Sequence, residues 1–451
     1  MTRLRSELLG PSNHKIVHLE RSRETHNIFQ RIATDAMSTR GSAFLDFAGN
    51  GGVLAGTGYA IHKFCTQLAT ALLLLATPAL AKEPIATGSP TAPGYVPTGT
   101  DEKGIWAEFD EQEREIKTSR LLVTDPGVNA YLRKIVCRLT GPAGCARVRL
   151  YVLRIPAFNA SMAPNGMMSV YTGLLLRVRD EAELAAVLAH EFAHFEHRHG
   201  LHGLRKQRNA AGWAAWLTAA SSLTGQPRNY FPTFMAAYQS YNRDQEREAD
   251  RSGLQSIKTA GYRTMAASAV WMHQREEQDA QAAALGVRSL KDRDYGPFQS
   301  HPMNVERMTY LAREAQALGG NAGFEGLAEF RAALAPVWPM LIDDQIKLND
   351  FGASEYLLAN LARGDWTGPL LFARAELHRA RNKMGDLLTA EALYRQALVR
   401  DDAPAAAWRG LGLVLTRTGN DKDAAAAIQE YLTRRPDAPD RSMLQAIATG
   451  L

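Results

Sequence analysis

The spacing of apolar residues separates predicted helices from predicted strands in the first part of this chain. Val148, Leu150 and Val152 recur at every second position, which is the period of a half-buried strand. Two stretches before them have the helical pattern instead. The predicted elements are helices near 103–118 and 126–139 and strands at 147–154 and 167–172.

The next helix is predicted to be mostly buried. Asp180 and Glu183 have the spacing of an N-terminal capping box, and Gly200 is a natural C-terminal stop. Between them, apolar side chains return at helical spacing, which indicates a face packed into a core. These side chains are Leu184, Val187, Leu188, Phe192 and Phe195.

After about residue 330 the sequence changes to Ala-, Leu- and Arg-rich helices with an internal repeat. The step from Leu377 to Leu411 gives a period of 34 residues, the length of a tetratricopeptide unit. Two units are fewer than a free-standing stack needs, so helices near 335–365 are expected to extend it; simple helical hairpins packed as a cap are the alternative. The aligned positions are Leu377, Gly385, Ala390, Tyr394 and Ala397 with Leu411, Gly419, Ala424, Ile428 and Tyr431.

Candidate chemistry lies in the buried helix, where His190, Glu191 and His194 form an HExxH pattern. Residues four apart share a helical face, so both imidazoles can reach one metal ion. Glu191 can then act as the general base toward a metal-activated water, which is the chemistry of peptide hydrolysis. A chance HExxH on a solvated helix is the alternative, but polar groups in a buried helix need partners, and a zinc site supplies them.

A third protein ligand is expected from the segment 242–250. Glu246 and Asp250 are one helical turn apart, whereas Glu248 points away, about 200° round the helix. Glu246 as ligand and Asp250 as acceptor for a ligand imidazole make a coherent site; a charged surface helix is the alternative. The three-histidine extension of HExxH is absent, because it needs glycine at 197 and histidine at 200, where the chain has His197 and Gly200.

These paired motifs resemble a known family. The HExxH pattern followed by EREADRSG (246–253) is similar to the HtpX/Oma/CAAX-protease family of gluzincin zinc metallopeptidases. Residues 158–175 resemble the strand segment that precedes the active helix there, and His301-Pro302 with Arg307 resembles a downstream element. The resemblance covers roughly residues 100–320. The periplasmic BepA-like members with C-terminal tetratricopeptide repeats are the most similar in organisation.

The resemblance implies an α+β, mainly helical fold: a gluzincin-type zinc peptidase domain with a small sheet, followed by all-α tetratricopeptide-like repeats. It supports one zinc ion per chain on His190, His194 and Glu246, with Glu191 catalytic. It also implies that His301 stabilises the oxyanion. The expected domains are a leader and signal peptide at 1–81, a linker at 82–100, the peptidase at 101–325 and the repeats at 330–451.

Composition and charge are those of an ordinary globular protein. Of 451 residues, 45% are apolar, and Lys plus Arg number 52 against 47 Asp plus Glu. No basic stripe interleaved with aromatic residues is present, so nucleic acid is not an expected partner. The small-residue-rich stretch 210–220 is too short to span a bilayer. It is either a buried helix or hairpin, or a flexible lid or peripheral membrane-touching element over the cleft.

The segment 68–81 predicts export. Its apolar run ends after about 14 residues, too few for the roughly 20 of a membrane span, and Ala79-Leu80-Ala81 is a signal-peptidase site. Cleavage is expected between Ala81 and Lys82, which places the protein in the periplasm. A signal this far along the chain suggests that translation starts at Met37 or beyond. Cys137 and Cys145 bracket a Gly-Pro turn, and a disulfide and two free thiols are both open.

The sequence therefore predicts a periplasmic zinc endopeptidase that acts on unfolded or misassembled envelope proteins. Its partners would be protein or peptide substrates, with the repeats recruiting envelope or outer-membrane assembly proteins. The alternative is an adaptor or chaperone-like protein, in which the repeats do the work and the peptidase domain is vestigial or autoinhibited. The intact HExxH pattern favours the first interpretation.

Overall fold

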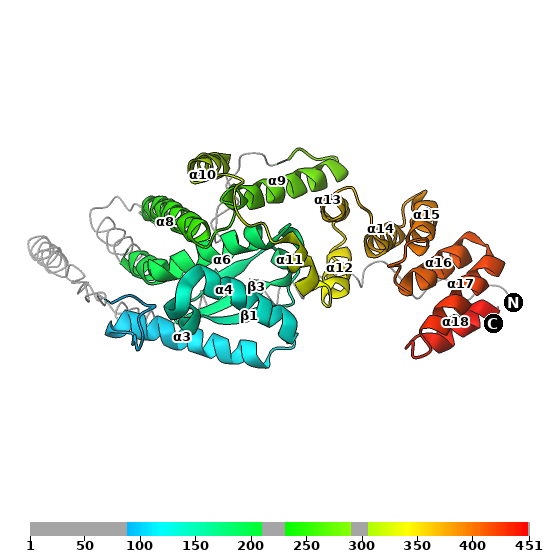
Figure 1. The fold of residues 1–451 in the computed structure, drawn as a ribbon, viewed down its shortest axis with the longest axis horizontal. Helices are drawn as coiled ribbons and strands as arrows, with labels where there is room; N and C mark the ends of the chain where they lie inside the picture. The colour runs from blue at the N-terminus through cyan, green and yellow to red at the C-terminus, as the bar shows by residue number, and fades with distance from the viewer. Residues whose placement is uncertain (1–87, 210–230, 290–304, 450–451) are drawn as a thin grey trace, which may run out of the picture. The chain divides into compact units, whose positions relative to one another are not determined.

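A computed structural model describes residues 88–209, 231–289 and 305–449 of the chain, with the backbone alone for 231–242 (Figure 1). Residues 199–209 are helical as well. The named elements are α3 (Gly99–Thr118), α4 (Pro126–Arg147), β1 (Arg149–Leu153), β2 (Ala160–Met162), β3 (Met167–Tyr171), α5 (Thr172–Arg177), α6 (Glu181–Glu196), α8 (Phe231–Thr259), α9 (Ala266–Ala284), α10 (Val305–Ala317), α11 (Leu327–Leu334), α12 (Trp338–Ile346), α13 (Phe351–Ala362), α14 (Gly368–Arg381), α15 (Asp386–Leu398), α16 (Ala406–Thr418), α17 (Asp421–Arg434) and α18 (Arg441–Thr449).

The three strands form one small mixed sheet in the order β1-β3-β2. The central strand β3 pairs in parallel with β1 and antiparallel with β2. The predicted strands at 147–154 and 167–172 are confirmed as β1 and β3, with slightly shorter bounds. The sequence pattern missed β2, because three residues show too few alternating positions for a period to be recognised. β2 lies at an edge of this sheet.

Helix α6 begins as predicted and ends earlier than predicted. The Asp180 side chain accepts a hydrogen bond from the Glu183 backbone N–H, and the Glu183 carboxylate accepts one from the Arg179 backbone. Gly200 is not the C-terminal stop. The helix ends at Glu196, because Arg198 takes a left-handed φ of 56° and the chain then re-enters a helix at residue 199. Gly200 faces Pro164, and a Cβ there would lie 3.1 Å from the proline ring.

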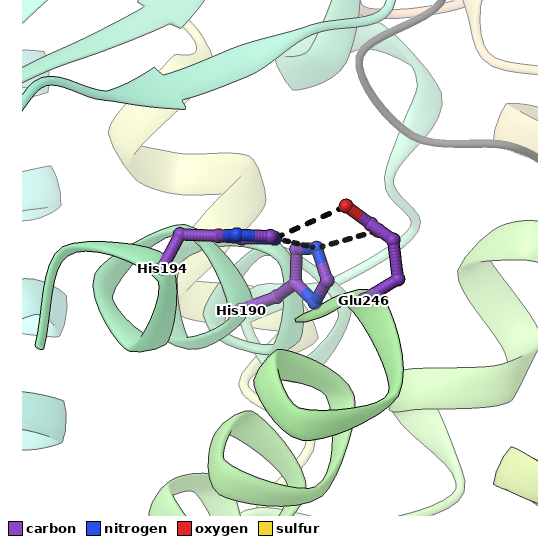
Figure 2. Close-up of side chains that lie close together, drawn as sticks. All are labelled: His190, His194 and Glu246. Atoms are coloured by element: carbon purple, nitrogen blue, oxygen red, sulfur yellow. Dashed lines mark hydrogen bonds and ion pairs between the residues drawn. The ribbon is translucent and has the colours of Figure 1, made fainter. Parts of the chain in front are cut away.

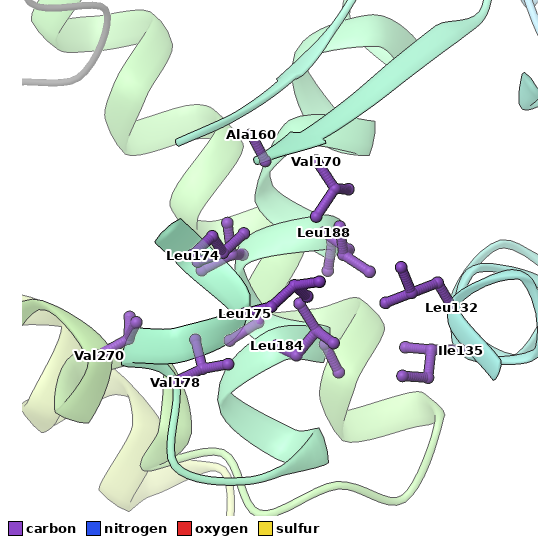
Figure 3. Close-up of a cluster of buried hydrophobic side chains, with 14 of the residues drawn as sticks. Leu132, Ile135, Ala160, Val170, Leu174, Leu175, Val178, Leu184, Leu188 and Val270 are labelled. Atoms are coloured by element: carbon purple, nitrogen blue, oxygen red, sulfur yellow. The ribbon is translucent and has the colours of Figure 1, made fainter. Parts of the chain in front are cut away.

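The main core surrounds α6 (Figure 3). Leu184 and Leu188 are buried against side chains from α4, α5, α9 and the sheet. A Leu→Ala substitution at such a site typically lowers the free energy of unfolding by about 2–5 kcal/mol, because it removes apolar contact and leaves a cavity. Helices α11 and α12 also bury Phe330, Leu334 and Leu341 in this core. The peptidase core therefore continues past residue 325.

Helix α4 contains a kink that brings the two cysteines together. Gly141 takes φ 66° and ψ −177°, and Pro142 follows it. Cys137 and Cys145 flank this kink and are joined by a disulfide, with their Cα atoms 4.5 Å apart. Of the two alternatives open from the sequence, the structure contains the disulfide.

The predicted 34-residue repeat is confirmed as two helical hairpins, α14–α15 and α16–α17. Gly385 and Gly419 adopt left-handed φ values of 86° and 79° where the paired helices are joined, a conformation that favours glycine. Leu358 of α13 clusters with Ala373 and Leu377 of α14. The helices near 335–365 therefore extend the stack as expected, and α18 packs on α17 at the other end.

Several sequence predictions lie outside the described residues. They are the leader and signal peptide at 1–81, the stretch 210–220 and His301. Among the helices that the structure does describe, none combines the length and apolar character needed to cross a membrane.

Candidate metal centre and its surroundings

Two helices bring the three predicted metal ligands together. His190 and His194 lie on consecutive turns of α6, and Glu246 projects from α8 (Figure 2). The two Nε2 atoms are 3.1 Å apart. Glu246 Oε1 lies 3.3 Å from His194 Nε2, and Glu246 Oε2 lies 3.4 Å from His190 Nε2. Within the described part of the chain, these are the residues that form a potential metal site.

The spacing of these atoms fits a tetrahedral zinc ion. With bonds of about 2.0–2.1 Å, two ligand atoms at the tetrahedral angle are about 3.3–3.4 Å apart. The two histidine Nε2 atoms, 3.1 Å apart, are close to that separation, and Glu246 presents a different carboxylate oxygen to each of them, at 3.3 and 3.4 Å. Two imidazoles and one carboxylate are also a donor set that zinc accepts with a fourth position left for water or substrate. The residues present therefore fit the predicted zinc ion.

A glycine sets the distance between the two ligand-bearing helices. A Cβ on Gly253 of α8 would lie 3.0 Å from the His190 backbone nitrogen and 3.1 Å from its Cα. These neighbours are backbone atoms, which cannot rotate away as a side chain can. The absence of a side chain at 253 thus lets α8 approach α6 closely enough for Glu246 to reach the two histidines.

Asp250, which the sequence suggested as an acceptor for a ligand imidazole, lies behind His190. Its Oδ1 is 2.9 Å from His190 Nδ1. Arg307 donates to both carboxylate oxygens at 2.7 and 2.8 Å, and the Tyr310 hydroxyl donates as well. Burial by itself would raise the pKa of Asp250, but Arg307 and His190 outweigh it and hold that pKa below its usual range. A carboxylate that stays ionised keeps the proton of His190 on Nδ1 and leaves Nε2 available as a metal ligand.

Arg307 connects this carboxylate to the rest of the centre. It is buried, its Nη1 lies 3.4 Å from Glu246 Oε2, and its guanidinium stacks over the Trp271 ring at 4.2 Å. The sequence indicated Arg307 only as part of the downstream element. Its contacts with Glu246 and Asp250 could not be predicted, because 57 residues separate it from Asp250.

The sequence missed a second residue, His199, which lies behind His194. His199 Nδ1 is 2.9 Å from His194 Nδ1, and His199 Nε2 is 3.1 Å from Glu248 Oε2. Burial, followed by the neighbouring His194, lowers the pKa of His199 to about 4. His199 follows the end of α6, so helical spacing gave no signal that it would turn back toward His194.

Glu191 and Glu248 differ in their surroundings. Glu191 is buried on α6, one residue after His190, and its role as general base stays a prediction. The Glu248 side chain is 56% exposed, which confirms that it points away from the buried Glu246. It is nevertheless connected to the centre, through His199.

The domain assignment follows from comparison with known families. Residues 126–315 match the model of peptidase family M48. The chain carries an M48 peptidase domain. All three candidate ligands lie inside the matched segment. Residues 379–439 match a tetratricopeptide repeat model, and this segment contains the end of α14 and all of α15, α16 and α17. The resemblance drawn from the paired motifs is thereby confirmed.

The curated relatives of the M48 domain include proteins of two groups. The mitochondrial metalloendopeptidase OMA1 of Schizosaccharomyces pombe is 32% identical over 170 residues, covering 37% of this chain and 49% of the relative. The mitochondrial metalloendopeptidase OMA1 of Bos taurus is 33% identical over 174 residues, which cover 36% of this chain and 32% of the relative. A putative beta-barrel assembly-enhancing protease of Vibrio cholerae is 27% identical over 164 residues, 34% of each chain. The chain thus spans 32% to 49% of the length of these relatives.

Proposed function

We propose that this protein is a zinc-dependent endopeptidase, with one zinc ion held by His190, His194 and Glu246. The observation that supports this most is the 3.1–3.4 Å spacing of their ligand atoms inside an M48 domain. Zinc bound there would polarise a peptide carbonyl and activate a water molecule at neutral pH.

The protein's own side chains would transfer the proton and hold the ligand histidine in place. The Glu191 carboxylate would accept a proton from the attacking water and return it to the departing amine. Asp250 would hold the proton of His190 on Nδ1, and Arg307 would keep Asp250 ionised and in place. For His301 we propose stabilisation of the oxyanion, on the family resemblance alone.

A substrate would bind as an added strand. β2 lies at a sheet edge and packs against α6, the helix that carries the histidines. An extended peptide alongside β2 would use main-chain hydrogen bonds, which do not depend on sequence. This suits unfolded or misassembled envelope proteins as substrates. It agrees with the name of the bacterial relatives, which are called beta-barrel assembly-enhancing proteases.

We propose the periplasm as the site of action. The Cys137–Cys145 disulfide suits an oxidising compartment. The predicted signal peptide would be removed between Ala81 and Lys82. N-terminal sequencing of the protein from a native envelope fraction tests this, and an N-terminus upstream of residue 60 would reject it.

The activity is tested by metal analysis together with cleavage of an unfolded protein. The full-length chain should contain one zinc per molecule and cleave casein, and chelation should abolish cleavage until zinc is restored. A chain without bound zinc, or a zinc-loaded chain inactive on every unfolded substrate tried, would contradict the proposal. The Glu191→Gln variant, which should bind but not cleave, can then capture natural substrates from envelope extracts.

The repeats favour a second role, as a recruiting module for envelope assembly proteins. Deleting residues 366–451 removes α14–α18 and leaves every proposed zinc ligand in place. The truncated protein should bind zinc and cleave casein but lose recognition of physiological partners. Higher casein activity after truncation would instead show that the repeats restrain the peptidase. If an inactive wild-type chain still bound envelope proteins through the repeats, the adaptor interpretation would stand.

A further inference from the structure

The two candidate ligand histidines are supported in different ways. His190 faces the buried carboxylate of Asp250 directly, at 2.9 Å. His194 faces another imidazole, that of His199, also at 2.9 Å. The nearest carboxylate on that side, that of Glu248, contacts His199 and not His194 itself. Neither His199 nor Glu248 belongs to the ligand set or to the predicted catalytic residues.

The position of each ring nitrogen determines which group donates in the hydrogen bonds from His194 to His199 and from His199 to Glu248. His194 Nε2 faces His190 and Glu246, so Nε2 is the atom that would bind zinc. A neutral imidazole with its Nε2 lone pair on a metal carries its proton on Nδ1. His194 Nδ1 must therefore donate, and His199 Nδ1 must accept. The proton of His199 then sits on Nε2 and is donated to Glu248 Oε2, 3.1 Å away.

We infer that His199, backed by Glu248, is a positioning residue that holds His194 in its metal-binding tautomer and ring orientation. This rests on the proposed zinc site. The His199 side chain is only 5% exposed, so its orientation is set by packing, whereas Glu248 is 56% exposed. Water can therefore replace part of what Glu248 contributes, and the larger effect belongs to His199. Loss of an outer partner of a ligand histidine typically weakens metal binding about 10- to 100-fold.

The test compares zinc affinity in full-length variants, measured by chelator competition, with the visible spectrum of the cobalt-substituted protein as a second readout. His199→Leu removes the acceptor for His194 and should weaken zinc binding by about 10- to 100-fold. His199→Asn places Oδ1 where the histidine has Nδ1, so it keeps the acceptor and should restore affinity to within about threefold of wild type. Glu248→Gln keeps an acceptor without its charge and should weaken binding by only about two- to fivefold.

Matched controls separate this role from a general structural effect. His202→Leu changes a partly buried histidine one turn further along the same helical stretch, and Glu306→Gln changes an exposed glutamate paired with Arg247. Both should keep wild-type zinc affinity and cobalt spectra. Thermal unfolding of the metal-free proteins shows whether each variant folds. Because Glu248 is exposed, its variant keeps the test open even if His199→Leu is unstable.

Three outcomes would overturn the inference. They are wild-type zinc affinity in a folded His199→Leu variant, equal weakening in His199→Leu and His199→Asn, and a Glu248→Gln variant indistinguishable from Glu306→Gln. A wild-type chain that binds no zinc is a different result, because it contradicts the proposed function itself.

Discussion

Helices approach each other through glycine in two regions of this molecule, with different consequences. In the peptidase domain, Gly253 of α8 lies against the His190 backbone. In the repeats, a Cβ on Gly410 of α16 would lie 2.4 Å from the Tyr394 ring of α15, and one on Gly412 would lie 2.6 Å from Ile428 of α17. The contact at Gly253 sets the position of the candidate metal ligand Glu246, whereas the contacts in α16 set only the packing of the stack. A close helix contact at glycine therefore positions a candidate metal ligand in one region and only packs neighbouring helices together in the other.

The two cores also differ in their polar content. Asp180, Glu183, His190, Glu246 and Asp250 are all buried around α6 and α8, and each has charged or imidazole partners. The apolar core of the repeats consists largely of alanine and leucine with Tyr394, and Asp386 is a buried charged group there, paired with His378 and Arg381. Buried charged groups are costly without partners, so the peptidase region depends on complete networks. The repeats should tolerate polar surface changes far better.

The largest expected difference between the regions concerns catalysis. Glu191→Gln should lower the rate of casein cleavage by about two to four orders of magnitude, because it removes the general base. Zinc content and thermal stability should stay at wild-type values, since the side chain keeps its size. Arg395→Gln, on the exposed face of α15, is the matched control from the repeats and should leave casein cleavage unchanged. Substantial residual cleavage by the Glu191 variant would remove Glu191 from the mechanism.

Next in size is the dependence of each region on zinc. Glu246→Ala should lose zinc and activity, because two histidines alone hold the ion weakly. A ligand present at about 1,000 times its Kd stabilises the folded state by about 4 kcal/mol. Chelation should therefore lower the melting temperature of the peptidase domain in wild type but not in Glu246→Ala, with the repeats unaffected in both. Calorimetry on the full-length and truncated chains can separate the two transitions. Unchanged zinc content in Glu246→Ala would contradict the ligand assignment.

The two glycine contacts give a direct test of the comparison. Gly253→Ala should push α8 away from α6 and reduce zinc affinity, measured by chelator competition. Gly410→Ala should instead lower the free energy of unfolding of the repeats by about 1–3 kcal/mol through overpacking. Its zinc affinity should stay at the wild-type value. If Gly410→Ala weakened zinc binding as much as Gly253→Ala, the separation between the two regions would be wrong.

The smallest expected effect concerns ion pairs. Glu113 is buried and paired with Arg149 and Tyr151, whereas Glu391 forms a more exposed pair with Arg395 on α15. Glu113→Gln should cost about 1 kcal/mol near neutral pH. Glu391→Gln should stay within about 0.5 kcal/mol of wild type. Equal effects would show that burial does not distinguish these pairs.

The pH dependence sharpens this last prediction. The Arg149 hydrogen bond, outweighing burial, lowers the pKa of Glu113 from 4.5 to about 2. The group is more easily ionised in the folded state, so its contribution is fully present above pH 4.5 and is lost as the pH falls toward 2. The difference in melting temperature between wild type and Glu113→Gln should therefore shrink over that interval. A difference that grew on acidification would have the wrong sign.

Much of this protein could be determined from the sequence because the relevant signals are local. The i, i+4 spacing of His190 and His194 places them on one helical face without knowledge of the rest of the chain. The 34-residue repeat likewise follows from periodicity and turn glycines such as Gly385. The paired spacing of Glu246 and Asp250 indicated a ligand and its support, and the structure brings both to His190.

The remaining features depend on contacts between distant segments. The end of α6 at Glu196 depends on the left-handed Arg198, which no residue preference predicts at this position. The contacts of His199 with His194 and Glu248, and of Arg307 with Asp250 and Trp271, arise only when α6, α8, α9 and α10 pack together. Sequence periodicity specifies which face of a helix is buried. Only tertiary packing specifies which buried side chain meets which partner, because that choice depends on the distances and angles between helices.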